Sequence, residues 1–216
     1  MPPAPPVCPD IPADVAFEAW ADAIADALHQ HGACRLPGFP DPALTDALRA
    51  DLLRLHAAQA LAPAATGRGA GRGLREDLRG DATLWLDDAR ASDCAATYLA
   101  QLDALRVALN RRLFLGVDEV EAHYALYPPG ARYAKHRDRF RDSDTRLVSF
   151  VTYLNPDWRE GDGGELRLSF ADTDGAVIDV APRTGSLCFL SELEHEVLPA
   201  RRERASIAAW LRRRTG

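Results

Sequence analysis

The chain has 216 residues, of which 47% are hydrophobic and 27% are charged, and these ordinary globular values exclude extensive disorder. Its net charge of −6 argues against nucleic acid as the main partner, because such binding depends on clustered positive charge. The sequence has no apolar run long enough to span a membrane and no signal-peptide pattern at its N-terminus. Its four cysteines lack the CxxC spacing of a zinc site. We therefore expect a cytoplasmic protein with no membrane or nucleic-acid partner.

The first half of the sequence has the periodicity of helices. Residues 1–11 are rich in proline and are expected to form a flexible arm. Apolar residues then recur at helical spacing over 12–31, 42–60 and 93–113. Asp41 is expected to cap the second of these helices, with Pro42 at its first position. A short strand is expected at 33–36, and the glycine-rich stretch 62–73 is expected to be a mobile loop.

After residue 117 the pattern changes to short strands separated by Gly, Pro and Asp. Runs rich in strand-forming residues occupy 123–127, 147–154, 165–170, 176–180, 186–190 and 206–211. Strands of this length and spacing indicate an antiparallel sandwich or barrel. The sequence thus predicts an α+β fold with a single domain over residues 12–216, in which a helical part (12–116) braces one face of the sheet structure (117–216).

A candidate metal site begins at His136, the only histidine that is followed two residues later by an acid, Asp138. Chance would give about one such pair in a chain of this composition, so the pair carries weight only through its setting. On an extended backbone, residues i and i+2 point to the same face, so both side chains can reach one metal ion. His195 follows a later apolar strand and can supply a third ligand from a neighbouring strand. Two histidines and one carboxylate leave coordination positions open, which suits Fe(II).

Arg204 is the candidate for binding a carboxylate near the metal. It lies nine residues after His195 and directly before the strand 206–211. A guanidinium can hold a carboxylate with two parallel hydrogen bonds, which the point charge of a lysine cannot match. Arg201 and Arg202 are rivals by proximity, but only Arg204 is even-spaced with Ser206 and so shares its face of the strand.

These motifs resemble those of the Fe(II)/2-oxoglutarate prolyl hydroxylases, particularly the branch that contains the hypoxia-inducible-factor prolyl hydroxylases and their bacterial relatives. The resemblance covers roughly residues 75–211 and rests on an ordered series of short matches. They are Arg79-Gly80-Asp81 with Trp85, Tyr127-Pro128, Tyr133, His136-x-Asp138, Arg146, Tyr153-Leu154-Asn155, Asp157-Trp158, Gly163-Gly164-x-Leu166, His195-Glu196-Val197-x-Pro199 and Arg204-x-x-Ile207.

The resemblance implies a fold and a set of residue roles. The fold is a double-stranded β-helix, or jelly roll, with N-terminal helices packed on its major sheet. In the family, the residues matching His136, Asp138 and His195 bind iron, and the one matching Arg204 pairs with the distal carboxylate of 2-oxoglutarate. The residues that would line the cosubstrate pocket are Tyr153, Tyr127 and Leu166.

Two further features follow from the same resemblance. The loop 139–146 corresponds to a finger that covers the substrate. Where the human enzymes carry a hydroxyl residue four positions after the arginine, this chain has Ala208, which should remove one hydrogen bond to the cosubstrate.

The implied activity is hydroxylation of a prolyl residue in a protein, with Fe(II), 2-oxoglutarate and O₂ as cofactors and ascorbate in support, and with release of succinate and CO₂. The substrate would be a protein or peptide with an exposed proline, such as the translation factor elongation factor Tu. Two alternatives stay open. One is the same chemistry on a free amino acid or small metabolite, and the other is a non-catalytic sensing or binding module on the same fold.

Overall fold

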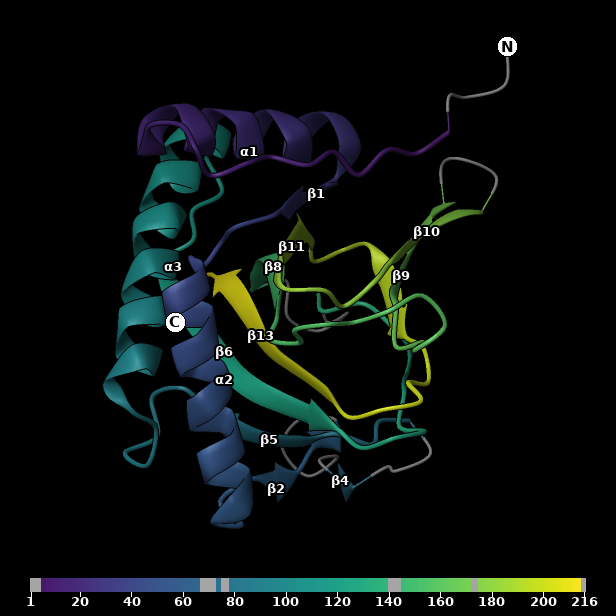
Figure 1. The fold of residues 1–216 in the computed structure, drawn as a ribbon. Coiled ribbons are helices and arrows are strands. Elements are labelled where there is room, and N and C mark those ends of the chain that lie inside the picture. The colour runs from purple at the N-terminus through teal and green to yellow at the C-terminus, as the bar shows by residue number, and fades with distance from the viewer. Residues whose placement is uncertain (1–4, 67–72, 75–77, 140–144, 172–174, 215–216) are drawn as a thin grey trace.

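The computed structural model describes residues 5–66, 73–74, 78–139, 145–171 and 175–214, and its helices lie in the first half of the chain (Figure 1). They are α1 (Phe17–His31), α2 (Pro42–Ala57) and α3 (Asp93–Leu113). The predicted cap of α2 is confirmed, because the Asp41 carboxylate accepts a hydrogen bond of 3.0 Å from the backbone N–H of Leu44. The helix at 93–113 has the predicted bounds.

Two predicted helix ends are wrong, and the backbone explains both. The first helix starts at Phe17 rather than residue 12, because the preceding segment runs alongside strand β1 (Ala33–Leu36). There the N–H of Ile11 donates to the carbonyl of Arg35, and the N–H of Arg35 donates to Pro9, each at 2.8 Å. The second helix stops at Ala57 rather than residue 60, since Gln59 has a φ of 55°.

The hydrogen bonds of Pro9 and Ile11 to β1 also show that part of the proline-rich arm is ordered. Its C-terminal end, at Pro9 and Ile11, is hydrogen-bonded to β1 rather than loose. The division of the chain into an arm of residues 1–11 and one domain of residues 12–216 stays a prediction.

The larger sheet has seven strands in the order β1-β11-β8-β13-β6-β5-β2. Beyond β1, these strands are β11 (Gly185–Leu190), β8 (Arg146–Tyr153), β13 (Arg204–Arg212), β6 (Glu119–Tyr127), β5 (Ala82–Trp85) and β2 (Ala62–Pro63). Alternate residues of β13 face opposite sides of this sheet. Ala205, Ile207 and Ala209 join the main hydrophobic core under the helices, so Arg204 and Ser206 face the other way.

The smaller sheet has four strands in the order β10-β9-β12-β7. They are β10 (Ala176–Val180), β9 (Leu166–Phe170), β12 (Glu194–Val197) and β7 (Tyr133–His136). Val197 of β12 packs against Ala125 and Tyr127 of the larger sheet, so the inner faces of the two sheets meet. With the four central strands of the larger sheet, these antiparallel strands form the predicted double-stranded β-helix.

The helices cover the outer face of the larger sheet (Figure 1). α1 contacts β1 and β11, α3 contacts β6, and α2 packs on α3. Buried apolar side chains from all three helices and from β6, β8 and β13 form one hydrophobic core, which leaves the inner face of the sheet for the polar residues of the site. None of the helices in the described part of the chain has the length and apolarity to cross a membrane.

The prediction of a loop at 62–73 is wrong at its start and its end. β2 pairs with β5, and β3 (Ala65–Thr66) pairs with β4 (Gly73–Leu74). These two-residue strands carry no alternating apolar pattern, so only their pairing partners reveal them. Residues 67–72 of that stretch lie outside the described residues, as do residues 140–144 of the predicted finger loop.

Candidate metal centre and carboxylate pocket

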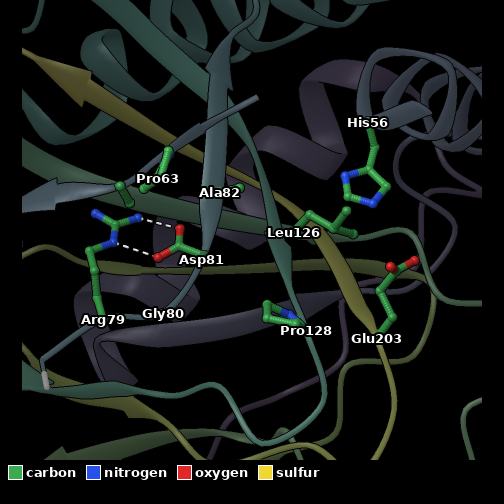
Figure 2. A pocket seen from close by; sticks show the side chains of 10 residues that line it. His56, Pro63, Arg79, Gly80, Asp81, Ala82, Leu126, Pro128 and Glu203 are labelled. Atoms are coloured by element: carbon green, nitrogen blue, oxygen red, sulfur yellow. Dashed lines mark hydrogen bonds and ion pairs between the residues drawn. The ribbon is translucent and has the colours of Figure 1, made fainter. Parts of the chain in front are cut away.

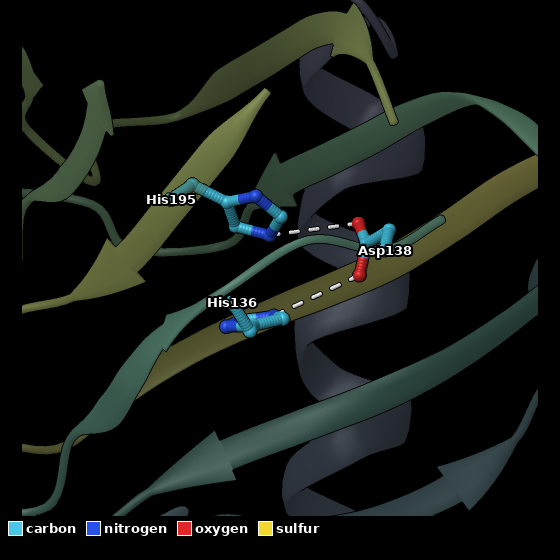
Figure 3. Close-up of side chains that lie close together, drawn as sticks. All are labelled: His136, Asp138 and His195. Atoms are coloured by element: carbon cyan, nitrogen blue, oxygen red, sulfur yellow. Dashed lines mark ion pairs between the residues drawn. The ribbon is translucent and has the colours of Figure 1, made fainter. Parts of the chain in front are cut away.

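His136 and His195 lie directly opposite each other on the antiparallel strands β7 and β12. Their ring centroids are 4.3 Å apart. Asp138 follows β7 and turns its carboxylate between the two rings (Figure 3), with Oδ1 3.7 Å from Nε2 of His136 and Oδ2 3.5 Å from Nε2 of His195. One ligand atom from each residue lies within 4.8 Å of the other two, so the three predicted metal ligands form a cluster.

Each imidazole is held in the tautomer that a metal needs. Nδ1 of His136 lies 2.8 Å from the carbonyl of Ala134, and Nδ1 of His195 lies 3.0 Å from that of Leu193. A carbonyl oxygen can only accept, so Nδ1 carries the proton in each ring and Nε2 presents its lone pair to the cluster. Burial, and next the neighbouring His195, lower the pKa of His136 to about 4, so this ring is neutral at physiological pH.

Asp138 is oriented by a pair of buried hydroxyl groups. Ser149 of β8 donates a hydrogen bond of 2.7 Å to Oδ2 of Asp138, and the hydroxyl of Ser191 lies 2.8 Å from that of Ser149. Burial alone would raise the pKa of Asp138, but the adjacent His195 and His136 outweigh it and lower this pKa to about 2. The cluster therefore offers one carboxylate charge and the Nε2 atoms of two imidazoles.

A stack of side chains supports His136 from the outside. Its ring lies 3.7 Å from that of Tyr133, nearly parallel, and the guanidinium of Arg79 lies 4.5 Å from the Tyr133 ring centroid. Arg79 in turn donates two hydrogen bonds of 2.6 Å to the buried carboxylate of Asp81. The position of the first histidine thus depends on the Arg79-Gly80-Asp81 motif.

Arg204 is among the most deeply buried side chains of the protein, with 1% of its surface exposed. Its Nε donates to the carbonyl of Gly164 at 2.9 Å, and its Nη1 donates to the hydroxyl of Ser206 at 3.1 Å. The rings of Tyr127 and Tyr153 flank the guanidinium, with centroids 5.1 Å and 5.2 Å away. Its Nη2 is buried and has no hydrogen-bond partner among the described residues.

An unpaired buried guanidinium nitrogen calls for an anionic ligand, because an isolated donor costs free energy when water is excluded. The hydroxyl of Tyr153 is likewise buried without a partner in the described part of the chain. Burial raises the pKa of Tyr153 to about 12, so it is a hydroxyl donor at neutral pH. Leu166, the third predicted pocket residue, is buried in the same apolar cluster as Tyr153.

The rival arginines lie elsewhere. Arg201 and Arg202 are exposed, and Arg202 forms an ion pair of 3.4 Å with Asp162 at the surface. The even spacing of Arg204 with Ser206 predicted that Arg204, among the three arginines, lies on the inner face of the strand. This is confirmed, since Arg204 alone of the three points between the two sheets. Its role toward a cosubstrate stays a prediction.

Sequence reasoning missed Ser149 and Ser191. Ser149 of β8 contacts Asp138, and Ser191, in the loop after β11, contacts Ser149. Isolated serines carry no motif, so no local signal could have found them. It also missed a pocket of about 490 Å³ at the edge of the larger sheet (Figure 2). His56, Leu126 and Glu203 help to line that pocket, which includes none of the three clustered residues.

The geometry suits a metal that binds two imidazoles and one carboxylate while keeping positions open for other ligands. Such an arrangement is typical of Fe(II) sites that react with O₂. The guanidinium of Arg204 and the hydroxyl of Tyr153 form a second site, which suits an anion. A metal site with open positions and a separate anion-binding site are the two features that a chelating dicarboxylate requires.

Comparisons with known proteins agree with this geometry. The family model of the 2OG-Fe(II) oxygenase superfamily matches residues 122–212. The chain is similar to the prolyl hydroxylase EGLN3 of Homo sapiens, with 30% identity over 196 residues that cover 87% of this chain and 81% of the human protein.

Two solved structures extend the likeness to the fold. The crystal structure of a Pseudomonas putida prolyl-4-hydroxylase superposes with a TM-score of 0.80 at 46% identity, covering 90% of this chain and 99% of that one. A prolyl hydroxylase from Trichoplax adhaerens, in complex with a hypoxia inducible factor oxygen degradation domain peptide fragment, gives a TM-score of 0.78 at 27% identity, covering 89% of each chain.

Proposed function

The chain belongs to the 2OG-Fe(II) oxygenase family, as a prolyl hydroxylase-like 2-oxoglutarate-dependent dioxygenase, and from this premise we propose that it hydroxylates a prolyl residue of a protein substrate. The observation that carries the proposal is that the His136–Asp138–His195 cluster and the buried donors of Arg204 and Tyr153 lie between the same two sheets. A family member uses Fe(II), 2-oxoglutarate and O₂, and this donor set fits the first two.

We assign the iron to His136, Asp138 and His195, and the distal carboxylate of 2-oxoglutarate to Arg204. Tyr153, Tyr127 and Leu166 would line the cosubstrate pocket. When bound, iron and 2-oxoglutarate together activate O₂, so that one oxygen atom enters the substrate while 2-oxoglutarate becomes succinate and CO₂. The protein contributes the positioning of the reactants.

Each residue contributes through its charge state and its contacts. The Nδ1–H donors of His136 and His195 keep both Nε2 atoms directed at the metal position. Asp138 supplies the single negative charge, which Ser149 holds in place through Oδ2. Burial of Asp138, His195 and Arg204 excludes bulk water, so the charge-assisted contacts at both ends are stronger than they would be in solvent.

The substrate that we propose is a protein with an exposed proline. The Trichoplax adhaerens relative was solved with a peptide fragment of hypoxia inducible factor, which supports a polypeptide substrate for this family branch. The likeness to a Pseudomonas putida prolyl-4-hydroxylase supports a bacterial protein as the target, and elongation factor Tu is our specific candidate. We place the reaction in the cytoplasm.

A free amino acid or small metabolite is the alternative substrate class. A non-catalytic module is disfavoured by the intact cluster and by the buried donors of Arg204 and Tyr153, which have no hydrogen-bond partner among the described residues. Substrate classes can be separated by supplying free proline and proline-containing peptides in parallel to the enzyme and measuring the succinate formed.

The decisive experiment is mass spectrometry of lysate proteins after incubation with the enzyme, Fe(II) and 2-oxoglutarate. The proposal expects a prolyl residue that gains the mass of one oxygen atom, and none when the His136→Ala variant replaces the enzyme. Succinate production with free proline alone, and no modified protein, would contradict a protein substrate.

A further inference from the structure

The pocket at the edge of the larger sheet, called the edge pocket below, has no part in the proposed reaction. Segments that are far apart in the chain form its walls (Figure 2). His56 comes from the last turn of α2, Leu126 from β6, and Glu203 directly precedes β13, while Arg79-Gly80-Asp81 closes the opposite side. Its volume of about 490 Å³ lies in the range of pockets that hold ligands.

The edge pocket combines apolar walls with one uncompensated charge. Asp81 is neutralised by Arg79, which donates two hydrogen bonds of 2.6 Å to its carboxylate. Glu203 is exposed, and no ion pair joins its side chain to another residue in the described part of the chain. With histidine neutral at pH 7, Glu203 therefore sets the net charge of the pocket. The apolar lining residues are Pro63, Ala64, Ala82, Leu126 and Pro128.

This combination suits a long cationic side chain. Lysine and arginine lay their methylene groups along apolar surface while the charged end reaches a polar partner. Here the partner is the Glu203 carboxylate, to which a cation can donate charge-assisted hydrogen bonds. An acidic side chain would instead meet Glu203 with like charge. The net charge of −6 on the whole chain also favours a basic partner segment.

Two contacts connect the edge pocket to the first metal ligand. The guanidinium of Arg79, in the pocket wall, lies 4.5 Å from the ring centroid of Tyr133, and that ring stacks on His136 at 3.7 Å. An extended chain advances by about 3.3–3.6 Å per residue, so three to six residues span roughly 10–20 Å. A polypeptide with its proline at the metal centre can therefore place a side chain from one of these positions in the edge pocket.

We infer that the edge pocket binds a lysine or arginine side chain of the protein substrate, three to six residues from the hydroxylated proline, through an ion pair with Glu203. The inference rests on the protein substrate proposed above. It makes Glu203 a specificity-determining residue that is separate from the metal ligands and from the residues assigned to the cosubstrate.

The test uses synthetic peptides with one central proline and six randomised residues on each side. The peptides are captured on immobilised enzyme loaded with Mn(II) and 2-oxoglutarate, so that no turnover is needed, and the bound peptides are sequenced by mass spectrometry. At one position three to six residues from the proline, lysine and arginine should be enriched over aspartate and glutamate by about two- to fivefold, as expected for one partly exposed ion pair.

Two variants of Glu203 and one control assign this preference to the edge pocket. Glu203→Gln should abolish the preference, and Glu203→Lys should reverse it toward acidic residues at the same position. Glu160→Lys is the matched control and should keep the preference, because it changes the net charge equally at an exposed glutamate that does not line the pocket. Calorimetry with 2-oxoglutarate should give the same affinity for Glu203→Gln as for the unaltered protein.

Each contrary result has a distinct meaning. Captured peptides without a positional preference, or with one that survives Glu203→Lys, would overturn the inference and leave the protein substrate standing. Loss of 2-oxoglutarate binding in Glu203→Gln would mean that Glu203 acts through the adjacent Arg204, which also overturns it. Failure of the unaltered enzyme to capture any peptide would count against the protein substrate itself, and the inference would fall with it.

Discussion

Gly164 lies directly against Arg204: its carbonyl accepts the Nε hydrogen of the arginine, and a Cβ at this position would come within 3.3 Å of Cδ of Arg204. The same Cβ would lie 2.9 Å from that of Ala200, closer than real contacts of this kind. Gly164 also has a φ of +70°, which a residue with a side chain adopts at a cost. The glycine thus lets the buried arginine take its place between the two sheets.

Gly164→Ala should destabilise the protein and weaken 2-oxoglutarate binding. The positive φ costs about 1–2 kcal/mol, and crowding of Arg204 and Ala200 adds about 1–3 kcal/mol. Gly161→Ala is the control, since its φ of +89° carries the strain while nothing lies within 4 Å of the added Cβ. Urea unfolding of the two variants measures the difference. Equal destabilisation would show that crowding against Arg204 contributes nothing.

Ser149→Ala should weaken metal binding, because the Asp138 carboxylate loses the donor that holds Oδ2. Loss of such an outer contact costs about 10- to 100-fold in metal affinity. Ser149→Thr keeps the hydroxyl and should retain most of the affinity, which separates the hydrogen bond from the packing of this position. Titration of the metal-free protein with Co(II), followed by its visible absorption, measures both affinity and coordination. An unchanged spectrum and affinity in Ser149→Ala would refute a role for this hydroxyl.

Arg204→Lys should weaken 2-oxoglutarate binding by about 10- to 100-fold, since lysine keeps the charge but loses the planar fork and the bond to Gly164. Arg202→Lys should leave the affinity unchanged, because Arg202 is exposed and pairs with Asp162. The Michaelis constant for 2-oxoglutarate and its calorimetric affinity both report the effect. A larger effect at position 202 would mean that the wrong arginine has been chosen.

His123 should make the fold sensitive to acid. Burial, and next Arg79, lower the pKa of His123 to about 4 from an ordinary value near 6.5. Above pH 6.5 the imidazole is neutral in both the folded and the unfolded protein, so its titration does not change the free energy of unfolding. Between pH 6.5 and 4 the unfolded chain binds a proton at His123 that the folded chain does not bind. The free energy of unfolding therefore decreases by roughly 3 kcal/mol in total as the pH is lowered over this range.

His123→Gln removes this titrating group, so its free energy of unfolding should decline less steeply than that of the unaltered protein as the pH falls from 7 to 4. Urea unfolding at several pH values gives the two slopes, and their difference isolates His123 from the other acid-sensitive groups. Parallel slopes would mean that His123 is protonated in the folded state.

Local patterns determined much of the fold and of the site. The helix at 93–113, the strand at 33–36 and the cap at Asp41 follow from periodicity and capping, which act within a few residues. The choice of Arg204 over Arg202 followed from alternation along a strand, which is also a local property. His195 was chosen because it follows a later apolar strand, and the resemblance to prolyl hydroxylases then implied the same role for it.

Only the tertiary structure decided which distant residues meet within and between the two sheets. The pairing of His136 with His195, the hydroxyl pair of Ser149 and Ser191 below Asp138, and the approach of Gly164 to Arg204 join segments that are far apart in the chain. Such contacts depend on strand order and register, which arise when the whole core packs and leave no periodic trace in the sequence. The short strands β2 to β4 were missed for the same reason, because their partners and not their own residues make them strands.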